Sequence, residues 1–314
     1  MASRGQIGGN IMKLLEGCKL CPRQCGVNRE NGMLGYCGVT AEVTIARAAL
    51  HMWEEPCISG RNGSGTVFFS GCPMKCVFCQ NTQIAIGTAG IKISIERLAE
   101  IFLELQKKGA HNINLVTPTH YVPQIVEALR LAKHNGLNIP IVYNTGSYEK
   151  VETLRLLEGL VDVWLPDCKY FDNELAARYS NAADYFEVAN TAITEMVRQA
   201  GDPVFKDGLM KRGVIVRHMI LPGQTRDSKR VIEELYRQYG DRIYISIMNQ
   251  YTPLSQMEKF PEINRKVTKR EYDKVVDYAI SINVEKAFIQ DGETAKESFI
   301  PDFDSRIGIF KQEE

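Results

Sequence analysis

The sequence predicts an α/β fold of the TIM-barrel type. From residue 66 onward, apolar β-branched runs alternate with amphipathic helical segments, a pattern typical of a parallel sheet. Six such strand-like runs can be counted, which is fewer than the eight of a closed barrel. Seven of the nine cysteines fall into two tight groups, one before and one directly after the first of these strands. We therefore expect a small cysteine-rich, metal-binding extension at residues 1–60, a barrel-type domain at 61–290 and a C-terminal tail at 291–314.

Length and composition set the first limits on function. A chain of 314 residues with 44% hydrophobic residues can form one barrel-sized domain with a real core. Lys plus Arg equals Asp plus Glu at 38 each, so no overall charge favours nucleic acid or an anionic membrane. The first ten residues lack the apolar core of a signal peptide, and no apolar run approaches the ~20 residues that span a bilayer. We expect a cytoplasmic protein in which the cysteines are reduced or bind metal.

The extension contains four cysteines within twenty residues, separated by glycines that permit sharp turns. Their order is C-x2-C-x3-C-x11-C, and they are Cys18, Cys21, Cys25 and Cys37. Four thiolates at this spacing can enclose a zinc ion or an iron-sulfur cluster, and both remain open. The plain alternative is a set of structural thiols without metal. Cys57 stands alone and is expected to be a buried apolar residue.

The second cysteine group follows the first expected strand, in the segment GTVFFSGCPMKCVFCQN. It has the spacing C-x3-C-x2-C and consists of Cys72, Cys76 and Cys79. A zinc site would require four ligands, whereas three thiolates on a cubane 4Fe-4S cluster leave one iron open to a ligand. A structural zinc knot or reduced core cysteines are the alternatives. We expect these three residues to be the catalytic centre.

The remaining elements alternate in chain order. The expected strands cover residues 67–70, 113–116, 139–143, 161–165, 214–220 and 243–248. Apolar residues recur at intervals of three and four in the helical segments, for example at Ile95, Leu98, Ile101, Phe102 and Leu105. Thr268 and Glu271 form a possible capping box at the start of the last helix, and a short apolar run follows at 287–290.

Polar residues follow the expected strands at their carboxyl ends, where α/β folds bind ligands. Strand two is followed by Thr119 and strand three by Asn144 in a Tyr-Asn-Thr-Gly-Ser turn. Strand four ends in Pro-Asp-Cys-Lys, so Asp167 and Lys169 share one face. Strand five carries Arg217, which could bind a carboxylate through two hydrogen bonds. The alternative for the turns is that Ser, Thr or Asn caps the following helix.

The cysteine triplet, with Phe78 before its last cysteine and Gln80-Asn81 after it, resembles the radical S-adenosylmethionine (SAM) superfamily. Together with the upstream CPRQCGVNR and the later VTPTH, it looks like the pyruvate formate-lyase activating enzyme-like group, here with an N-terminal cysteine-rich extension. The resemblance implies a partial (β/α)6 barrel of TIM type, open at one side. It also implies that SAM binds the open iron and is split by one electron to methionine and a 5′-deoxyadenosyl radical.

The resemblance further implies which residues contact SAM. These are Phe78, Thr119, Asn144, Asp167, Lys169 and Arg217. Two positions depart from the group. The Thr119 segment lacks the Gly-Gly-Glu-Pro-like sequence found in much of the superfamily, and Gln250 and its neighbours stand where activating enzymes place a histidine.

We therefore expect a radical SAM enzyme, an oxidoreductase-type catalyst that abstracts hydrogen from a protein or peptide. A small-molecule or cofactor-biosynthesis enzyme with the same chemistry is one alternative. A non-catalytic iron-sulfur or zinc binding protein is the alternative from another class. The resemblance implies an electron donor such as flavodoxin or ferredoxin, and nothing in the sequence indicates a nucleic acid or membrane partner.

Overall fold

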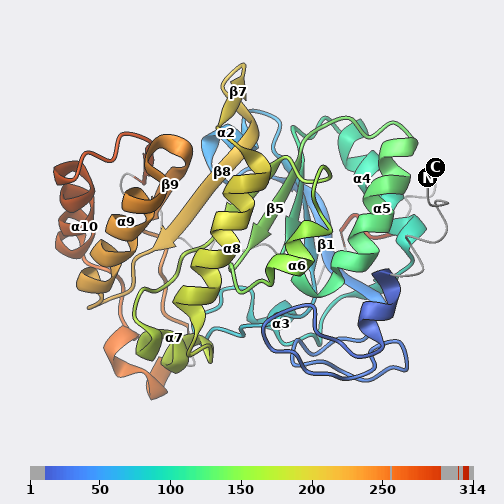
Figure 1. Cartoon of the computed structure of the whole chain (residues 1–314), viewed down its shortest axis with the longest axis horizontal. Coiled ribbons are helices and arrows are strands. Elements are labelled where there is room, and N and C mark those ends of the chain that lie inside the picture. The colour runs from blue at the N-terminus through green and yellow to red at the C-terminus, as the bar shows by residue number, and fades with distance from the viewer. Residues whose placement is uncertain (1–10, 255–256, 291–302, 304–306, 311–314) are drawn as a thin grey trace.

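The fold is described from a computed structural model for residues 11–254, 257–290, 303 and 307–310. In this part of the chain, one sheet runs in the order β10-β9-β8-β6-β5-β4-β2-β1-β3, and β7 pairs with β8 (Figure 1). The strands are β1 Val43–His51, β2 Ser64–Phe69, β3 Ile91–Ile93, β4 Ile113–Val116, β5 Ile141–Thr145, β6 Val163–Pro166, β7 Val204–Lys206, β8 Leu209–Met219, β9 Tyr244–Met248 and β10 Ala287–Ile289.

The central strands pair in parallel, from β2 through β4, β5, β6, β8 and β9 to β10. These strands include all six that the sequence predicts, and β10 corresponds to the short run at 287–290. The sheet has two different edge strands, β3 and β10. A mostly parallel, unclosed sheet of this kind is consistent with the expected partial barrel.

The helices are α2 Pro56–Ser59, α3 Thr82–Ala85, α4 Ile95–Lys107, α5 Val122–His134, α6 Val151–Arg155, α7 Asn173–Ser180, α8 Tyr185–Ala200, α9 Thr225–Tyr239 and α10 Lys269–Ser281. The longer helices α4, α5, α8, α9 and α10 lie along one face of the sheet (Figure 1), whereas α2 packs against the other face of β5, β6 and β8. Short 3-10 turns occur at η1 Lys13–Leu15, η2 Thr119–Tyr121, η3 Gly240–Arg242, η4 Met257–Lys259 and η5 Pro261–Ile263. The expected capping box of Thr268 and Glu271 begins α10.

Burial explains why the central strands are continuous apolar runs. Every residue of β2, β4, β5 and β6 is buried. Strands covered on both faces need side chains that pack on both sides, so they show no polar alternation. Trp164 of β6 and Tyr143 of β5 are fully buried, with their rings 5.2 Å apart.

All six expected strands lie after residue 66, but the structure also has a strand before residue 60. Val43–His51 forms β1, which pairs antiparallel with β2 and β3 and so extends the barrel sheet. Its sequence, VTIARAALH, contains an arginine and three alanines, which have low strand propensity, and this hides the strand from pattern analysis. The sheet therefore includes residues 43–51 of the expected extension, because β1 covers the side of β2 that faces away from β4.

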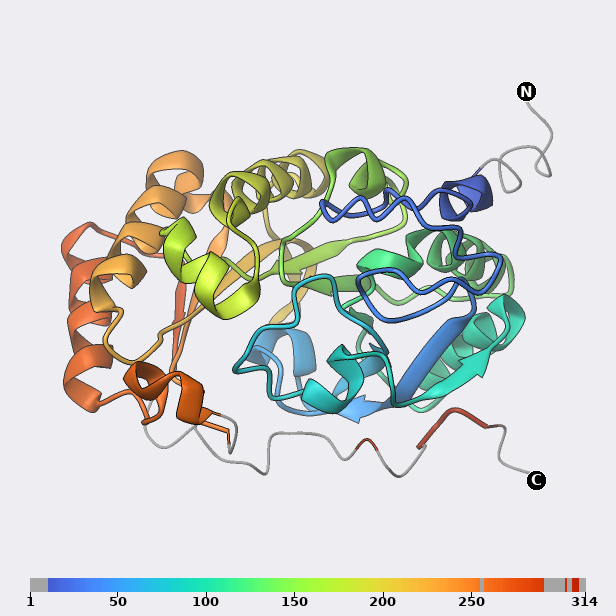
Figure 2. The ribbon, with the colours of Figure 1, turned by 90° about the horizontal axis from the view of Figure 1, so that it is seen from below.

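Residues before β1 form loops beside the carboxyl ends of the parallel strands. In Figure 2 the N-terminal segment lies next to the loop that follows β2. The side chain of Arg23 donates to the Pro73 carbonyl at 2.7 Å, and the Cys72 amide donates to the Cys37 carbonyl at 3.3 Å. Most of the expected tail at 291–314 lies outside the described residues, but Ile307 accepts a hydrogen bond from Ala48 of β1. No helix among the described residues combines the length and apolar character needed to cross a bilayer.

We predict that Gly38→Ala destabilises the protein because its backbone packs against residues 86 and 87. Gly38 has φ +85°, and a Cβ there would collide with the Ile86 carbonyl oxygen. Gly32 has a similar φ of +79° but open space around it, so Gly32→Ala should cost only the conformational strain, roughly 1 kcal/mol. Gly38→Ala should cost a further 1–3 kcal/mol, roughly, from overpacking.

Denaturant unfolding of the two variants under anaerobic conditions measures this difference. Equal losses for Gly38→Ala and Gly32→Ala would show that the contact between the N-terminal segment and residues 86–87 contributes nothing to stability.

Candidate active site

A cavity of about 260 Å3 opens at the carboxyl ends of the parallel strands. Its walls come from the loop after β2 and from the ends of β4, β5, β6, β8 and β9. All the residues predicted to form the catalytic and SAM-binding site line this one cavity. They are Cys72, Cys76, Phe78, Cys79, Thr119, Asn144, Asp167, Lys169 and Arg217.

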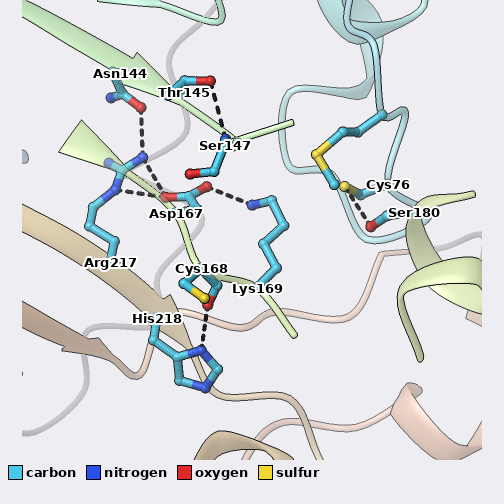
Figure 3. Close-up of polar contacts among 12 residues, drawn as sticks. Cys76, Asn144, Thr145, Ser147, Asp167, Cys168, Lys169, Ser180, Arg217 and His218 are labelled. Atoms are coloured by element: carbon cyan, nitrogen blue, oxygen red, sulfur yellow. Dashed lines mark hydrogen bonds and ion pairs between the residues drawn. The ribbon is translucent and has the colours of Figure 1, made fainter. Parts of the chain in front are cut away.

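The three cysteines of the cavity lie on the loop that follows β2, and neighbouring donors orient their sulfur atoms. The Met74 amide lies 3.4 Å from Cys72 Sγ. The Ser180 hydroxyl, at the end of α7, lies 2.9 Å from Cys76 Sγ, as Figure 3 shows. Hydrogen bonds from N–H and O–H groups stabilise a thiolate more than a thiol. The loop therefore presents three sulfurs, two of which already have donors suited to a ligated thiolate.

Burial controls the protonation of these thiols. It raises the pKa of Cys72 to about 11, and the nearby Cys76 adds to the rise. It raises the pKa of Cys79 to about 12, with smaller contributions from Cys72 and Cys76. Without a metal, Cys72 and Cys79 stay protonated at neutral pH, and binding a metal would release their protons. As their side chains stand, no group of three or more His, Cys, Asp or Glu residues in the described part of the chain is placed to hold a metal ion.

Opposite the cysteine loop, an ion-pair network joins the ends of β6 and β8 (Figure 3). Asp167 accepts from Lys169 Nζ at 2.6 Å through one carboxylate oxygen and from Arg217 Nε at 2.8 Å through the other. Burial tends to raise the pKa of Asp167, but the two cations more than offset it and leave the pKa below its ordinary value. Only 15–18% of each of these side chains is exposed. The predicted pair of Asp167 and Lys169 is thus a trio with Arg217.

The network includes Glu54, which the sequence did not identify as a site residue. Arg217 Nη1 lies 3.3 Å from Glu54 Oε2, and its Nη2 donates to Asn144 Oδ1 at 2.6 Å. Burial raises the pKa of Glu54, and the Arg217 charge opposes that rise. Glu54 follows β1, which is antiparallel to β2. The rule that ligands bind at the carboxyl ends of parallel strands therefore does not select it. Its one sequence signal was a pair of adjacent glutamates before Pro56.

Thr119 and Thr145 line the cavity, but their hydroxyls point to a buried carboxyl behind it. Both donate to Glu149 Oε1 at 2.6 Å, and Tyr143 lies 3.3 Å from the same oxygen. Burial raises the pKa of Glu149 to about 7. Its other oxygen is buried without a hydrogen-bond partner in the structure. Thr119 therefore forms part of the cavity wall, but its hydroxyl already donates to Glu149.

Backbone strain also gathers at the strand ends. Thr117, which lines the cavity after β4, has φ +55°, a conformation that is unfavourable for a β-branched residue. Ser147, after β5, has φ +64°. Gly146 directly precedes Ser147, and an added Cβ there would lie 2.9 Å from the Met74 sulfur. Strain of this kind is concentrated at ligand sites, and sequence patterns do not reveal it.

Aromatic and apolar residues close the cavity around Phe78. Phe78 is buried, and its ring lies 6.0 Å from Tyr251 and 6.5 Å from Tyr170. On the other face of β6 and β8, Cys168 and His218 are buried away from the cavity, and His218 Nδ1 lies 2.7 Å from the Cys168 carbonyl (Figure 3). Cys168 thus lies on the face opposite Asp167 and Lys169, and His218 on the face opposite Arg217, as strand alternation requires.

Four of the remaining six cysteines, Cys18, Cys21, Cys25 and Cys37, which we name the N-terminal cysteine group, lie outside the cavity. Burial raises the pKa of Cys21 to about 12, and the thiols of Cys37 and Cys18 contribute to the rise. A Cβ on Gly35 would lie 3.2 Å from Cys37 Sγ and 3.9 Å from Cys25 Sγ. As their side chains stand, these four cysteines do not form a group that is placed to hold a metal ion, so the metal site expected from their spacing stays a prediction.

Comparison with known proteins identifies a family and a relative that covers most of the chain. A family model described as "Radical SAM superfamily" matches residues 66–236. The uncharacterized protein MJ0674 of Methanocaldococcus jannaschii is 30% identical over 289 residues, which is 89% of this chain and 78% of the relative.

Similarity to solved structures is found at low sequence identity. Methylornithine synthase (PylB) aligns with 92% of this chain and 72% of its own, with a TM-score of 0.50 and 15% identity. SuiB of Streptococcus suis, bound to S-adenosylmethionine, aligns with 70% of this chain and 48% of its own, with a TM-score of 0.49 and 13% identity. The chain therefore spans about half the length of SuiB.

We predict that Glu149→Gln makes the protein more stable at high pH. Below about pH 4.5 the carboxyl is protonated in both the folded and unfolded states. As the pH rises toward 7, the unfolded chain loses this proton while the folded chain keeps it, so stability falls. Between pH 5 and 8 this loss should amount to roughly 2–3 kcal/mol in the wild type.

Glutamine can retain the oxygen that accepts the three hydroxyls and does not titrate, so the loss should be absent in Glu149→Gln. Unfolding free energies at pH 5 and 8, compared with those of the exposed control Glu285→Gln, measure the effect. The same pH dependence in Glu149→Gln and the wild type would contradict the prediction.

Proposed function

Since this chain belongs to the radical SAM superfamily, we propose that it cleaves S-adenosylmethionine reductively and abstracts hydrogen from a protein or peptide substrate. The observation that supports this most directly is the cavity itself. It combines three cysteines from one loop with the network of Asp167 and Arg217 on the facing strand ends. A zinc knot would have no need of a cavity lined by buried charges.

The superfamily implies a 4Fe-4S cluster, and the residues of the cysteine loop fit that group. The donor set is three thiols at the spacing C-x3-C-x2-C, and two of the sulfurs have hydrogen-bond donors. When bound, the cluster and SAM supply a one-electron cleavage that yields methionine and a 5′-deoxyadenosyl radical. Cys72, Cys76 and Cys79 would hold the cluster, and the superfamily chemistry requires a fourth iron without a protein ligand.

The charged residues of the cavity suit the amino acid part of SAM, which carries an amino group and a carboxylate. Lys169 and Arg217 offer positive charge for the carboxylate, and Asp167 and Glu54 offer negative charge for the amino group. Because they already pair with one another, these side chains are held in place before a ligand arrives. Glu54 supplies a carboxylate that the segment around Thr119 lacks.

The apolar part of the wall keeps water away from a reactive intermediate. Phe78, Tyr148, Met219 and Met248 contribute to it. A radical that can attack any nearby C–H bond has to be surrounded by a fixed wall. The dense ring packing around Phe78 provides such a wall.

A protein or peptide substrate is supported by the apolar residues at the end of β1. Trp53 lines the cavity with 58% of its surface exposed, and the neighbouring Met52 is 45% exposed. Exposed apolar side chains at a cavity entrance suit a bulky partner better than a small polar metabolite. This also fits the proposed place of the chain in the pyruvate formate-lyase activating enzyme-like group.

Two alternatives keep the same fold. In one, the substrate is a small molecule or a cofactor precursor, and Trp53 then closes over it. In the other, the chain only binds metal and catalyses nothing. Formation of methionine and 5′-deoxyadenosine from SAM and the reduced protein separates the enzyme from the binding protein.

We also propose that the N-terminal cysteine group, Cys18, Cys21, Cys25 and Cys37, binds a second metal centre, either zinc or an iron-sulfur cluster. The charges of Cys18 and Cys37 act on Cys21, and the sulfurs of Cys37 and Cys25 both lie beside Gly35. The region before β1 has a small apolar cluster around Leu15 and Leu20, so a metal would help to order it. The electron donor would be flavodoxin or ferredoxin, and the protein would act in the cytoplasm.

We predict that the triple variant Cys72→Ala, Cys76→Ala, Cys79→Ala forms no 5′-deoxyadenosine. Its SAM cleavage should fall to background because no thiolate remains to hold the cluster. Product formation by anaerobically reconstituted protein with dithionite is the measurement, and Cys168→Ala serves as the control for loss of a buried thiol. Cleavage by the triple variant at the wild-type rate would refute the proposed function.

We predict that Lys169→Met weakens SAM binding and leaves stability nearly unchanged. Asp167 keeps Arg217 as its partner in this variant, so no buried charge is left without a counter-charge. Loss of a hydrogen bond to a charged group should reduce the affinity roughly 10- to 100-fold.

Equilibrium dialysis of SAM with the cluster-loaded protein gives the affinity, and unfolding gives the stability. The matched control is Lys269→Met, which removes an exposed lysine from the surface of α10. If Lys169→Met lowers stability but binds SAM as the wild type does, Lys169 is a structural residue.

A further inference from the structure

A second cavity, of about 240 Å3, is enclosed by parts of the chain that the catalytic cavity does not use. Its walls come from the segment before β1 and the start of β1, from the junction of β3 and α4, and from α5. The linings of the two cavities have no residue in common. A molecule bound in the second cavity would therefore not meet the catalytic cysteines.

Three polar side chains of this second lining each have one buried atom without a hydrogen-bond partner in the described part of the chain. These atoms are Arg29 Nε, Thr40 Oγ1 and Gln124 Oε1. Arg29 is 0% exposed and Gln124 is 2% exposed. A buried polar atom without a partner lowers stability, and native proteins contain few of them. Three such atoms around one cavity indicate a polar ligand that pairs with them.

Arg29 shows which charge that ligand carries. Its guanidinium donates to the His120 carbonyl at 2.6 Å and to the Thr40 carbonyl at 2.7 Å, and Nη1 lies 3.9 Å from Cys18 Sγ. Across the described residues, Arg29 forms no ion pair with a carboxylate. A buried cation without a counter-charge is strongly unfavourable. A carboxylate in the cavity would balance this charge, accept from Nε and accept from the Thr40 hydroxyl.

Gln124 and Glu30 show what the ligand needs besides a carboxylate. The amide nitrogen of Gln124 already donates to the Ala41 carbonyl at 2.5 Å, so its free oxygen requires a donor. Glu30 also lines the cavity, is exposed, and forms no ion pair within the described ranges. An ammonium group supplies both the hydrogen-bond donor and the positive charge.

The size and the remaining walls limit the rest of the ligand. Drug-sized molecules occupy cavities of roughly 300–1,000 Å3, so this cavity suits a smaller molecule. Met12 and Ile93 are half-buried apolar residues of the lining. They would contact a short apolar group more favourably than a polar one.

We propose that the second cavity binds a free α-amino acid with an apolar side chain. Its carboxylate pairs with Arg29 and Thr40, and its ammonium group pairs with Gln124 and Glu30. The inference goes beyond the proposed function and does not depend on SAM cleavage.

The proposed site is connected to the catalytic cysteine loop through one residue. His120, whose carbonyl accepts from Arg29, places its Nε2 2.7 Å from the Ser70 carbonyl. Ser70 lies two positions before Cys72. A ligand that fixes Arg29 thus fixes a neighbour of the backbone that presents the catalytic cysteines.

Isothermal titration calorimetry of the full chain with L-valine, L-leucine and L-methionine tests the site. At least one of the three should bind with a Kd of about 1 mM or lower. For that amino acid, the amide, which lacks the carboxylate, and the deaminated acid, which lacks the ammonium group, should each bind at least roughly tenfold more weakly. Absence of binding by all three amino acids, or equal binding of either analogue, would overturn the proposal.

The variant Thr40→Val places the binding in this cavity. Because the Thr40 hydroxyl has no hydrogen-bond partner in the structure, its loss should leave the stability of the free protein unchanged or higher. Loss of a hydrogen bond to the ligand carboxylate should nevertheless weaken binding roughly tenfold or more. The matched control is Thr191→Val, which changes an exposed threonine of α8 and should bind as the wild type does.

Two further outcomes separate this site from the catalytic cavity. If Thr40→Val binds the amino acid like the wild type while Lys169→Met does not, the ligand occupies the catalytic cavity and the inference fails. If the wild type binds the amino acid but forms no 5′-deoxyadenosine, the inference holds and the proposed function fails.

Discussion

The parallel pairing of the central strands decides where the whole site lies. Each parallel strand delivers its carboxyl end to the same edge of the sheet, so residues distant in sequence meet there. The Asp167 amide donates to the Thr145 carbonyl, and the Cys168 amide donates to the Arg217 carbonyl. These backbone bonds join the strand ends just where the ion pair between Asp167 and Arg217 forms. The charged network is thus a consequence of strand register rather than of loop folding.

This dependence explains which parts of the structure could be predicted from sequence. Apolar β-branched runs report burial on both faces of a strand, and β4, at Ile113–Val116, has the bounds that we expected. Once the strands are known, the rule that ligands bind at their carboxyl ends selects Asn144, Asp167 and Arg217 without any knowledge of contacts. All three line the cavity. Strand alternation likewise placed Cys168 on the opposite, buried face.

What could not be predicted depends on contacts across long stretches of sequence. Glu54 reaches the cavity because β1 pairs antiparallel with β2, and no local pattern marks that strand. Nothing in the sequence near Glu149 indicates that it is a buried carboxyl. Only the structure shows the hydroxyls of Thr119, Tyr143 and Thr145 that donate to it. The contact between Cys37 and Cys72 joins two motifs that are 35 positions apart, and each motif taken alone looks self-contained. The sequence therefore predicts which residues could be ligands, and only the structure shows which residues lie next to them.

Charge balance links these separate pieces. The cavity holds two cations and two carboxylates in contact, so it is close to neutral before a ligand binds. The N-terminal cysteine group holds the cation of Arg29 and would gain negative charge from thiolates. Glu149 lies between the two sites, since its donors Thr119 and Thr145 line the cavity and its charge acts on Cys21. A carboxylate at this point would add negative charge beside thiolates, and burial avoids that by holding the pKa of Glu149 near 7. The carboxyl of Glu149 can therefore lie near both the cavity and the N-terminal cysteine group, because it remains largely uncharged below neutral pH.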